Sequence, residues 1–192
     1  MVKVSKKESE KNHAGIVGAA SVAFRTHGVA AASVSEIAES AGLTHGALYR
    51  HFPDKNALAA SAITADFDQI VALLEDLKRS GSPSADYVRT YLGTDHRDHF
   101  IWGCPAAPLA AEIHRLDDGV QTAFASGLDR NLASLAALIG QVDALQAREQ
   151  AIFMLSAMAG AMSLARAVKS ADPAFSDEIL QTVANRLSGK DI

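Results

Sequence analysis

Apolar residues recur every three or four positions along most of the chain, and β-branched residues rarely alternate with polar ones. The first spacing is the period of an amphipathic α-helix, whereas a half-buried strand alternates at every second residue. The pattern therefore predicts an all-α protein. We expect a small helical domain over residues 1–55 and a larger helical domain over residues 56–192.

Capping signals set the ends of the first two helices. The first helix is expected over about Glu8–His27, because Gly28 is a natural left-handed stop at a helix C-terminus. The second should begin after Ser33, whose hydroxyl forms a capping box with Glu36 three residues later. This second helix is short and should end before Gly42.

Two further helices follow within the next forty or so residues of the sequence. Thr44 can cap a third helix that runs through Phe52. Pro53 is expected in the first turn of a fourth helix, where its missing N–H costs nothing. That helix should continue to the sequence SGSPS at residues 80–84, which breaks it.

The rest of the chain is predicted to contain five more helices. An irregular segment, TDHRDHFIWGCP, separates the first from the second, and a turn is expected at Asp117–Gly119. The expected helices cover about residues 87–92, 105–116, 120–140 and 144–169, followed by one that begins at Asp172-Pro173.

Residues 34–52 combine a short helix, a turn that contains Gly42 and a second short helix, which is the arrangement of a helix-turn-helix. Small and apolar side chains suit the contact between the two helices, and glycine can adopt a turn conformation that other residues resist. The residues expected to lock the helices together are Ile37, Ala38, Leu48 and Phe52.

In a helix-turn-helix the second helix enters the DNA major groove with its N-terminal residues at the base edges. If Leu48 and Phe52 face inward, the helical period turns the neighbouring polar residues outward. His45 and Arg50 can then donate to base edges, and Tyr49 can contact a phosphate or a thymine methyl group. The predicted DNA contacts are Ser33, Ser35, Thr44, His45, Gly46, Tyr49, Arg50, His51 and Lys55.

The run SVSEIAESAGLTHGALYRHFPDKNAL at residues 33–58 strongly resembles the DNA-binding signature of the tetracycline-repressor-like (TetR/AcrR) family. The resemblance includes IA, AGL, LYRHF and the lysine two residues past the proline, and it covers about residues 10–60. It implies a one-component transcriptional repressor. The remaining helices are then expected to sense a small hydrophobic or reactive effector and to form a homodimer.

The last two predicted helices are candidates for that dimer interface. The helix over residues 144–169 is apolar on nearly all sides in its middle, which predicts burial on more than one face. The last helix carries an apolar stripe of Phe175, Ile179, Val183 and Leu187. We expect a four-helix interface across a two-fold axis, with an intrachain core helix as the alternative. Such a dimer can place two recognition helices about 34–36 Å apart on a near-palindromic site.

Charge is distributed unevenly along the chain, although the net charge is only -4. Residues 1–55 hold seven basic and five acidic residues, a net +2, and the remainder carries -6. A basic module joined to an acidic body fits a nucleic-acid reader with a separate ligand domain, although so small a difference can also arise by chance.

Aromatic and sulfur-containing residues of the larger domain are candidates for effector binding, because pockets in helix bundles are mostly apolar with a few polar groups. Cys104 precedes a predicted helix N-terminus, where the helix dipole favours the reactive thiolate. An electrophile or oxidant sensor is one reading of Cys104, and an inert buried thiol is the favoured one. The predicted effector contacts are Tyr87, Tyr91, Phe100, Trp102, Cys104, Phe124, Met154 and Met158.

Other functional classes have less support. The sequence holds no glycine-rich phosphate loop, nucleophile elbow or closely spaced metal signature, so we expect neither an enzyme nor a cofactor. A helical adaptor that dimerises without binding DNA is an alternative. A metal site is a second one, although histidines and aspartates in a polar segment are usually solvated. Its candidate ligands are Asp95, His96, Asp98 and His99, with Glu112 or His114.

The sequence also predicts a soluble cytoplasmic protein. Its first residues include lysines but no apolar run of the kind that export signals contain. The apolar stretch at residues 151–165 is shorter than the ~18 residues that a membrane span needs. The single cysteine cannot form an internal disulfide, so the chain does not need an oxidising compartment.

Overall fold

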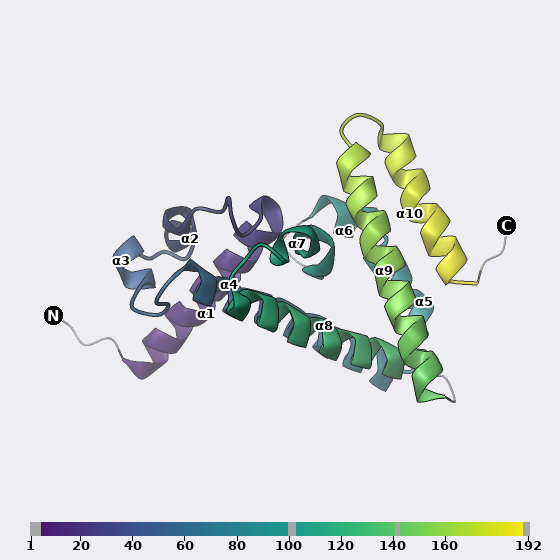
Figure 1. The fold of residues 1–192 in the computed structure, drawn as a ribbon, viewed down its shortest axis with the longest axis horizontal. Coiled ribbons are helices and arrows are strands. Elements are labelled where there is room, and N and C mark those ends of the chain that lie inside the picture. The colour runs from purple at the N-terminus through teal and green to yellow at the C-terminus, as the bar shows by residue number, and fades with distance from the viewer. Residues whose placement is uncertain (1–4, 100–102, 141–142, 190–192) are drawn as a thin grey trace. The chain divides into compact units, whose positions relative to one another are not determined.

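The computed structural model describes residues 5–99, 103–140 and 143–189, and every regular element within them is an α-helix (Figure 1). The all-α prediction is therefore confirmed. In chain order the helices are α1 (Lys6–His27), α2 (Val34–Ser40), α3 (His45–Leu48), α4 (Lys55–Arg79), α5 (Ser84–Tyr91), α6 (Thr94–Asp98), α7 (Ala106–Ile113), α8 (Asp118–Ile139), α9 (Ala144–Val168) and α10 (Pro173–Leu187).

The chain divides into two compact units. Unit 1 consists of residues 1–66 and 108–126, and unit 2 consists of residues 67–107 and 127–192. Unit 1 therefore contains α1, α2 and α3, and unit 2 contains α5, α6, α9 and α10. The helices α4, α7 and α8 each contribute residues to both units.

Helix α1 ends at His27 as predicted and begins at Lys6, two residues before the expected start. The Ser5 hydroxyl accepts a hydrogen bond from the Glu8 N–H at 3.2 Å and caps its N-terminus. Gly28 ends the helix at φ +80°, and its N–H donates to the Phe24 carbonyl at 2.8 Å. One face of α1 supplies the core of unit 1, since Ile16 and Phe24 are at most 1% exposed.

Helix α3 is shorter than predicted. It ends at Leu48 instead of continuing to Phe52. The N–H groups of Arg50 and His51 donate to carbonyls three residues back, at 3.2 and 2.8 Å, so the chain tightens into turns after α3.

The start of α4 also differs from the prediction. Pro53 lies before the helix, and Asp54 caps it, because the Asp54 carboxylate accepts a hydrogen bond from the Ala57 N–H at 2.8 Å. The sequence signal for a helix start was therefore correct, but the capping residue is the aspartate that follows the proline.

Three predictions for the middle of the chain were wrong in detail. Helix α6 occupies part of the segment that was predicted to be irregular. Helix α7 ends at Ile113, before the predicted end at Leu116. The expected turn at Asp117–Gly119 is a helix start, because the Asp117 carboxylate accepts a hydrogen bond from the Gly119 N–H at 2.8 Å and α8 begins at Asp118.

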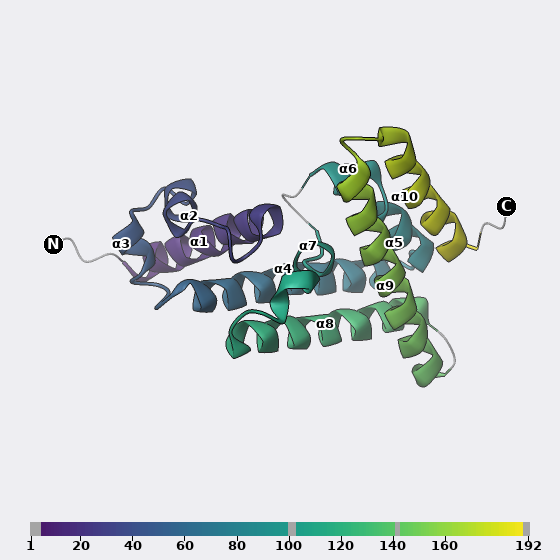
Figure 2. The same cartoon turned by 45° about the horizontal axis from the view of Figure 1, so that its top comes forward.

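Within unit 2, α9 and α10 lie side by side and run in opposite directions (Figures 1 and 2). The Ser176 hydroxyl of α10 donates to the Ala165 carbonyl of α9 at 2.8 Å. One face of α9 is buried within the single chain, and burial of a second face stays a prediction for the proposed dimer. The buried α9 residues are Ala147, Ala151, Met154, Leu155, Met158, Ala161, Met162 and Ala165.

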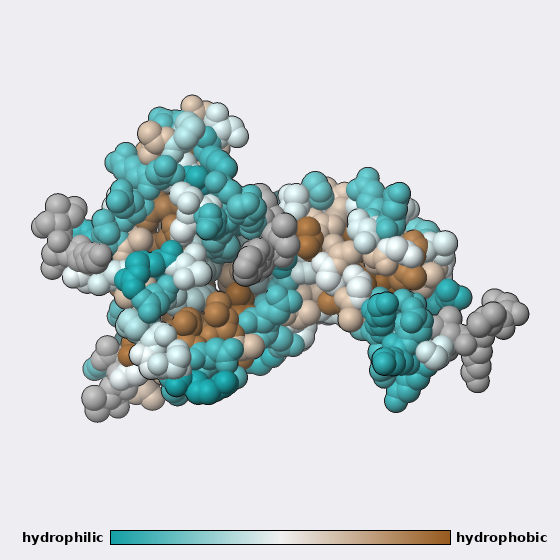
Figure 3. Space-filling model, turned by 180° about the vertical axis from the view of Figure 1, so that it is seen from behind, coloured by the Kyte–Doolittle hydropathy of each residue, from teal (hydrophilic) through white to brown (hydrophobic). Residues whose placement is uncertain are grey.

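The opposite face of α9 exposes large apolar side chains. Leu145, Phe153 and Leu164 are each more than 60% exposed. Phe175, the first residue of the apolar stripe predicted on α10, is 47% exposed. The face of the molecule drawn in Figure 3 likewise shows apolar areas between polar ones.

Two helices, α4 and α9, are long and apolar enough to cross a membrane by length and composition alone. Core helices of soluble proteins meet the same criterion. Both helices bury part of their most apolar windows inside the protein, 44% for α4 and 39% for α9.

Candidate nucleic-acid interface and effector cavity

The turn between α2 and α3 is closed by a Schellman motif. The Leu43 N–H donates to the Ala38 carbonyl at 2.9 Å, and the Gly42 N–H donates to the Glu39 carbonyl at 2.9 Å. Gly42 has φ +70°, a left-handed conformation that glycine adopts without strain. A Cβ there would meet no heavy atom within 4 Å, so the turn requires glycine for its backbone conformation and not for space.

The helix-turn-helix has a buried side and an exposed side, as the sequence predicts. The four predicted lock residues Ile37, Ala38, Leu48 and Phe52 are at most 3% exposed. Tyr49 is 41% exposed, and Thr44, His45, Gly46 and Arg50 are also exposed. The rings of His45 and Tyr49 meet edge to face, with centroids 4.9 Å apart, so these two side chains share one exposed surface.

Several predicted phosphate contacts also have a local structural role. The hydroxyls of Ser33 and Thr44 each accept a hydrogen bond from the N–H three residues later, at 3.4 and 3.3 Å. Each hydroxyl can still donate its own proton outward. Lys55 Nζ donates to the Ala30 carbonyl at 2.9 Å, and Ser35 is exposed.

His51 is half-buried beside a residue that the sequence did not single out. The His13 ring of α1 stacks on Phe52 at a centroid distance of 4.7 Å and lies 6.0 Å from the His51 ring. These contacts attach the segment after α3 to α1. A histidine on an exposed helix face gives no sequence signal of such a contact.

Glu112 of α7 holds the turn that follows α1. Its carboxylate accepts hydrogen bonds from the Val29 N–H at 2.6 Å and the Ala30 N–H at 3.4 Å. The Ala30 carbonyl also accepts a hydrogen bond from Lys55 Nζ. The same short turn therefore contacts both the Glu112 carboxylate and the Lys55 ammonium group. The sequence suggested Glu112 only as a metal ligand, because nothing local links it to a turn more than eighty residues away.

A buried polar cluster joins α1 to α4. The Arg25 guanidinium donates to the Ser21 hydroxyl at 2.6 Å and pairs with the Asp66 carboxylate, which also accepts a hydrogen bond from Ser21. All three residues are at most 6% exposed. Burial raises the pKa of Asp66, and Arg25 and Ser21 offset only part of that rise.

Unit 2 contains a cavity of about 510 Å³. This volume falls within the range of roughly 300–1,000 Å³ that is usual for small-molecule sites. Three of the predicted effector contacts, Tyr87, Tyr91 and Cys104, line it. Its other lining residues are Ile70, Thr90, Asp95, His96, His99 and Gly103.

Of the other predicted effector contacts, the three that the structure describes do not line this cavity. Met154 and Met158 are buried in the core of unit 2, and Phe124 belongs to unit 1. Phe100 and Trp102 lie outside the described residues. The sequence missed the polar lining from α6, because that segment was interpreted as irregular and solvated.

Aromatic rings form much of the cavity wall. Tyr87 and Tyr91 meet edge to face at 5.9 Å, and Tyr91 meets His96 in the same way at 4.6 Å. Burial raises the pKa of both phenols well above the ordinary value, with a smaller contribution from Cys104. Both phenols are therefore uncharged at neutral pH. Cys104 is 2% exposed, and its sulfur accepts a hydrogen bond from Asn131 Nδ2 at 3.6 Å.

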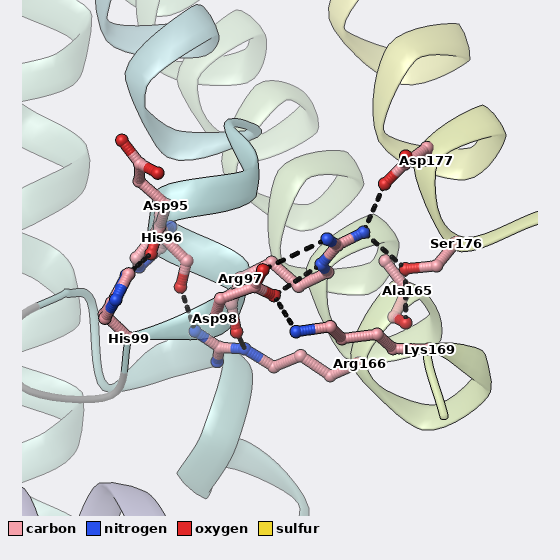
Figure 4. A network of polar contacts seen from close by, with 10 residues as sticks. All are labelled: Asp95, His96, Arg97, Asp98, His99, Ala165, Arg166, Lys169, Ser176 and Asp177. Carbon is pink, nitrogen blue, oxygen red and sulfur yellow. Dashed lines mark hydrogen bonds and ion pairs between the residues drawn. The ribbon is translucent and has the colours of Figure 1, made fainter. Parts of the chain in front are cut away.

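Helix α6, which supplies part of this wall, is attached to α10 through a buried arginine (Figure 4). Arg97 is 6% exposed and donates to Asp98, to the Ser176 hydroxyl at 2.9 Å and to Asp177. Lys169 Nζ lies 2.6 Å from the Asp98 carboxylate. Hydrogen bonds from Arg97 and Lys169 hold the pKa of Asp98 far below its usual range.

A second arginine attaches α6 to α9. The Arg166 guanidinium donates to the carbonyls of His96 and Arg97 at 2.6 and 3.2 Å (Figure 4). The two arginines therefore connect the short helix α6 to both α9 and α10. Because α6 has only five residues, these contacts stabilise it where its own hydrogen bonds are few.

The histidines of the proposed metal site make other contacts. His96 Nδ1 lies 2.6 Å from the Tyr91 carbonyl, and His99 Nδ1 lies 2.9 Å from the Asp95 carbonyl. Within the part of the chain that the structure describes, no group of three or more His, Cys, Asp or Glu residues is placed to hold a metal ion.

Comparison with known proteins identifies the N-terminal segment. Residues 16–62, which include α2, α3 and the turn between them, match the family profile described as bacterial regulatory proteins, tetR family. In this segment the chain is similar to the tetR family. The resemblance stated from the signature at residues 33–58 is thereby confirmed.

Named transcriptional regulators are similar to part of this chain. The HTH-type transcriptional regulator TtgR of Pseudomonas putida is 41% identical over 63 residues, which are 33% of this chain and 30% of TtgR. The regulator AcrR of Shigella flexneri is 40% identical over 58 residues, which are 30% of this chain and 27% of AcrR. The chain thus matches about a third of the length of these relatives.

Two solved structures share the fold over nearly the whole chain. A TetR-family transcriptional regulator from Agrobacterium tumefaciens has a TM-score of 0.75 at 22% identity, covering 93% of this chain and 98% of its own. The reduced form of E. coli NemR has a TM-score of 0.73 at 18% identity, covering 93% and 95%. The predicted fold, an N-terminal helix-turn-helix followed by a larger helical part, is confirmed.

Proposed function

We propose that this chain is a cytoplasmic, dimeric transcriptional repressor of the TetR family that a small molecule releases from a near-palindromic operator. The observation that carries the proposal is the exposed side of the helix-turn-helix. It presents His45, Tyr49 and Arg50 together, opposite a buried lock. An element that served only to pack against the rest of the chain would not need exposed aromatic and cationic side chains.

The proposed roles follow from position on the helix-turn-helix. His45 and Arg50 donate to base edges, and Tyr49 contacts a phosphate or a thymine methyl group. Gly46 allows close approach of the backbone. Ser33, Ser35, Thr44, His51 and Lys55 contact phosphates and set the register of the protein on the duplex.

The exposed apolar faces of α9 and α10 support the proposed homodimer. Leu145, Phe153 and Leu164 on α9 and Phe175 on α10 are all more than 45% exposed in the single chain. Monomers rarely expose so many large apolar side chains on neighbouring helices. A two-fold interface of four helices would bury them and would hold two recognition helices at the spacing of successive major grooves.

Helix α6 offers a route from the cavity to these helices within unit 2. It supplies Asp95 and His96 to the cavity wall, His99 directly after it also lines the cavity, and Arg97 on the helix contacts α10. An effector acts only through different affinities for the DNA-binding and released states. Movement of α6 on binding would change its contacts with the proposed dimer helices.

The experiment that tests the function is binding of the purified protein to the DNA that flanks its own coding region, with footprinting at several salt concentrations. We expect a protected near-palindrome whose apparent affinity falls steeply with salt, because phosphate contacts release counterions. The Tyr49→Ala/Lys55→Ala variant should lose protection while remaining a folded dimer. Full binding by that variant, or a flat salt dependence, would favour the adaptor alternative.

The proposal does not include an enzymatic activity. The two relatives named above and the Agrobacterium tumefaciens structure are described as transcriptional regulators. In this proposal the acidic and histidine side chains of unit 2 have structural roles or line the cavity.

A further inference from the structure

Two hydroxyls of the cavity wall, those of Tyr87 and Tyr91, are buried without a hydrogen-bond partner among the described residues. The Tyr91 hydroxyl interacts with the Cys104 side chain, which leaves Tyr87 as the hydroxyl for a ligand. Tyr87 is 2% exposed, and within the described residues its hydroxyl finds neither a donor nor an acceptor. A buried polar group without a partner is costly, and most such groups in native proteins are satisfied. Tyr87 also lines the cavity, so a molecule bound there can supply the missing partner.

The charges that face the cavity exclude some classes of ligand. Among the described residues that line it there is no lysine or arginine, and the only carboxylate is Asp95, on the exposed side of α6. His96 of α6 and His99 directly after it are the only other titratable groups of this segment in the lining, and each ring has one nitrogen at a backbone carbonyl. The remaining titratable groups, Tyr87, Tyr91 and Cys104, are at most 3% exposed. The Arg166 guanidinium, outside the lining, acts on Tyr91 but already donates to the His96 and Arg97 carbonyls. An anion would therefore leave water without a positive partner in the described lining, which is unfavourable.

The wall also favours a flat ring system. The edge-to-face contacts of Tyr87 with Tyr91, and of Tyr91 with His96, continue as an aromatic surface along one side of the cavity. Aromatic pairs gain beyond their buried area when their faces and edges meet in this way. A bound ring can extend this arrangement.

We infer that the cavity takes an uncharged aromatic molecule with a carbonyl group, whose oxygen accepts a hydrogen bond from the Tyr87 hydroxyl. A carbonyl fits better than a further hydroxyl, because a phenol O–H is a strong donor and its oxygen a weak acceptor. The inference rests on the proposed function only in naming this molecule as the effector; the binding itself requires no DNA.

The test uses calorimetric titration of the full chain with compounds of matched size. The main pair is 2-acetylnaphthalene and 2-ethylnaphthalene, which differ in the carbonyl oxygen. We expect the ketone to bind about tenfold more tightly to the natural protein, the effect of one well-formed buried hydrogen bond. The saturated ketone 2-acetyldecalin and the anion 2-naphthoate should both bind more weakly than 2-acetylnaphthalene.

Two variants assign the preference to one hydroxyl. Tyr87→Phe keeps the ring and removes the hydroxyl, and the ketone should then bind no more tightly than the hydrocarbon. Thr90→Val is the matched control, because it removes an exposed hydroxyl that also lines the cavity. It should keep the tenfold preference. Melting temperatures of both variants check the fold, and Tyr87→Phe should not melt below the natural protein because its hydroxyl has no partner to lose.

Three results would overturn the inference: equal affinity for the ketone and the hydrocarbon, a preference that survives in Tyr87→Phe, or tightest binding of 2-naphthoate. Operator binding is measured separately on the same protein samples. A Tyr87-dependent preference without any response of the DNA complex supports the cavity assignment and contradicts the proposed release by effector. Loss of DNA binding in all samples contradicts the proposed function alone.

Discussion

The helix-turn-helix of unit 1 and the cavity of unit 2 differ in how far apart in sequence their parts lie. Residues within one short stretch cap α2 and α3, close the turn at Gly42 and lock the two helices together. The cavity instead combines Ile70 of α4 with Tyr87 of α5, His96 of α6 and Cys104 before α7. A site formed by neighbouring residues leaves a sequence pattern, and a site assembled by the tertiary fold does not.

The same comparison holds for the polar contacts that support each site. Hydroxyl caps of the helix-turn-helix reach only three residues along the chain. Arg97 and Arg166 support the cavity wall through partners that lie at least 69 residues away. The surroundings of the helix-turn-helix are not wholly local, however, because Asp66 and Glu112, from later parts of the chain, contact α1 and the turn that follows it. Variants at these contacts show how much each site depends on distant residues.

The largest effect is expected at the buried pair of unit 1. Arg25→Met leaves the Asp66 carboxylate buried without its partner, which should lower the free energy of unfolding by about 3–5 kcal/mol. Urea unfolding measures the loss. The double variant Arg25→Met/Asp66→Leu should recover most of it, because no unpaired charge is then buried. A single variant that unfolds at the same urea concentration as the natural protein would show that the pair does not support α1.

A smaller effect is expected for a single proposed DNA contact. Lys55→Ala should weaken operator binding by about 1.5–3 kcal/mol, the usual range for a hydrogen bond to a charged group. The dependence of log affinity on log salt should become shallower by about 1. Lys78→Ala, which removes the same charge from an exposed position in unit 2, is the control and should change neither quantity. An unchanged salt slope in Lys55→Ala would remove Lys55 from the phosphate contacts.

Sequence reasoning succeeded where the deciding interactions are local. Gly28 and Gly42 end their helices, and Ser33 and Thr44 start theirs, because each cap involves residues within five positions. It failed at α6, whose sequence gives a weak helix signal and whose structure depends on Arg97 and its partners on α10.

The two candidate sites differ in the same way, because local residues decide the first and distant contacts decide the second. The sequence identified the exposed residues of the helix-turn-helix, because the helical period alone decides which way they face. For the cavity it found Tyr87, Tyr91 and Cys104, because their residue types suit a pocket. It could not find His96, because the helix that places this residue depends on contacts with α9.

An intermediate effect, below that of Lys55, is expected at the long-range support of the helix-turn-helix. Glu112→Ala removes the acceptor for the N–H groups of Val29 and Ala30, and should cost about 1–1.5 kcal/mol of stability because water can reach part of this turn. Operator affinity should fall as well, since Ala30 also positions Lys55. Glu112→Gln keeps an acceptor and should recover part of both losses. Normal operator affinity in Glu112→Ala would show that the DNA-binding element needs no support from α7.

The smallest effect is expected from the pH dependence of Asp98 in unit 2. Its pKa is lower in the folded chain than the ordinary value of 3.8, so its charge adds stability that is present above about pH 4 and is lost as the pH falls below it. The partly exposed pairs with Arg97 and Lys169 limit this contribution to below about 1 kcal/mol. In urea unfolding at a series of pH values, Asp98→Asn should be less stable than the natural protein at pH 6, and the difference should shrink toward pH 3. Asp66 has the opposite shift, because its raised pKa gives stability that is present at low pH and is lost as the pH rises through the folded value. A difference at Asp98 that stays constant with pH would mean that packing of the side chain, and not its charge, holds α6 against α9 and α10.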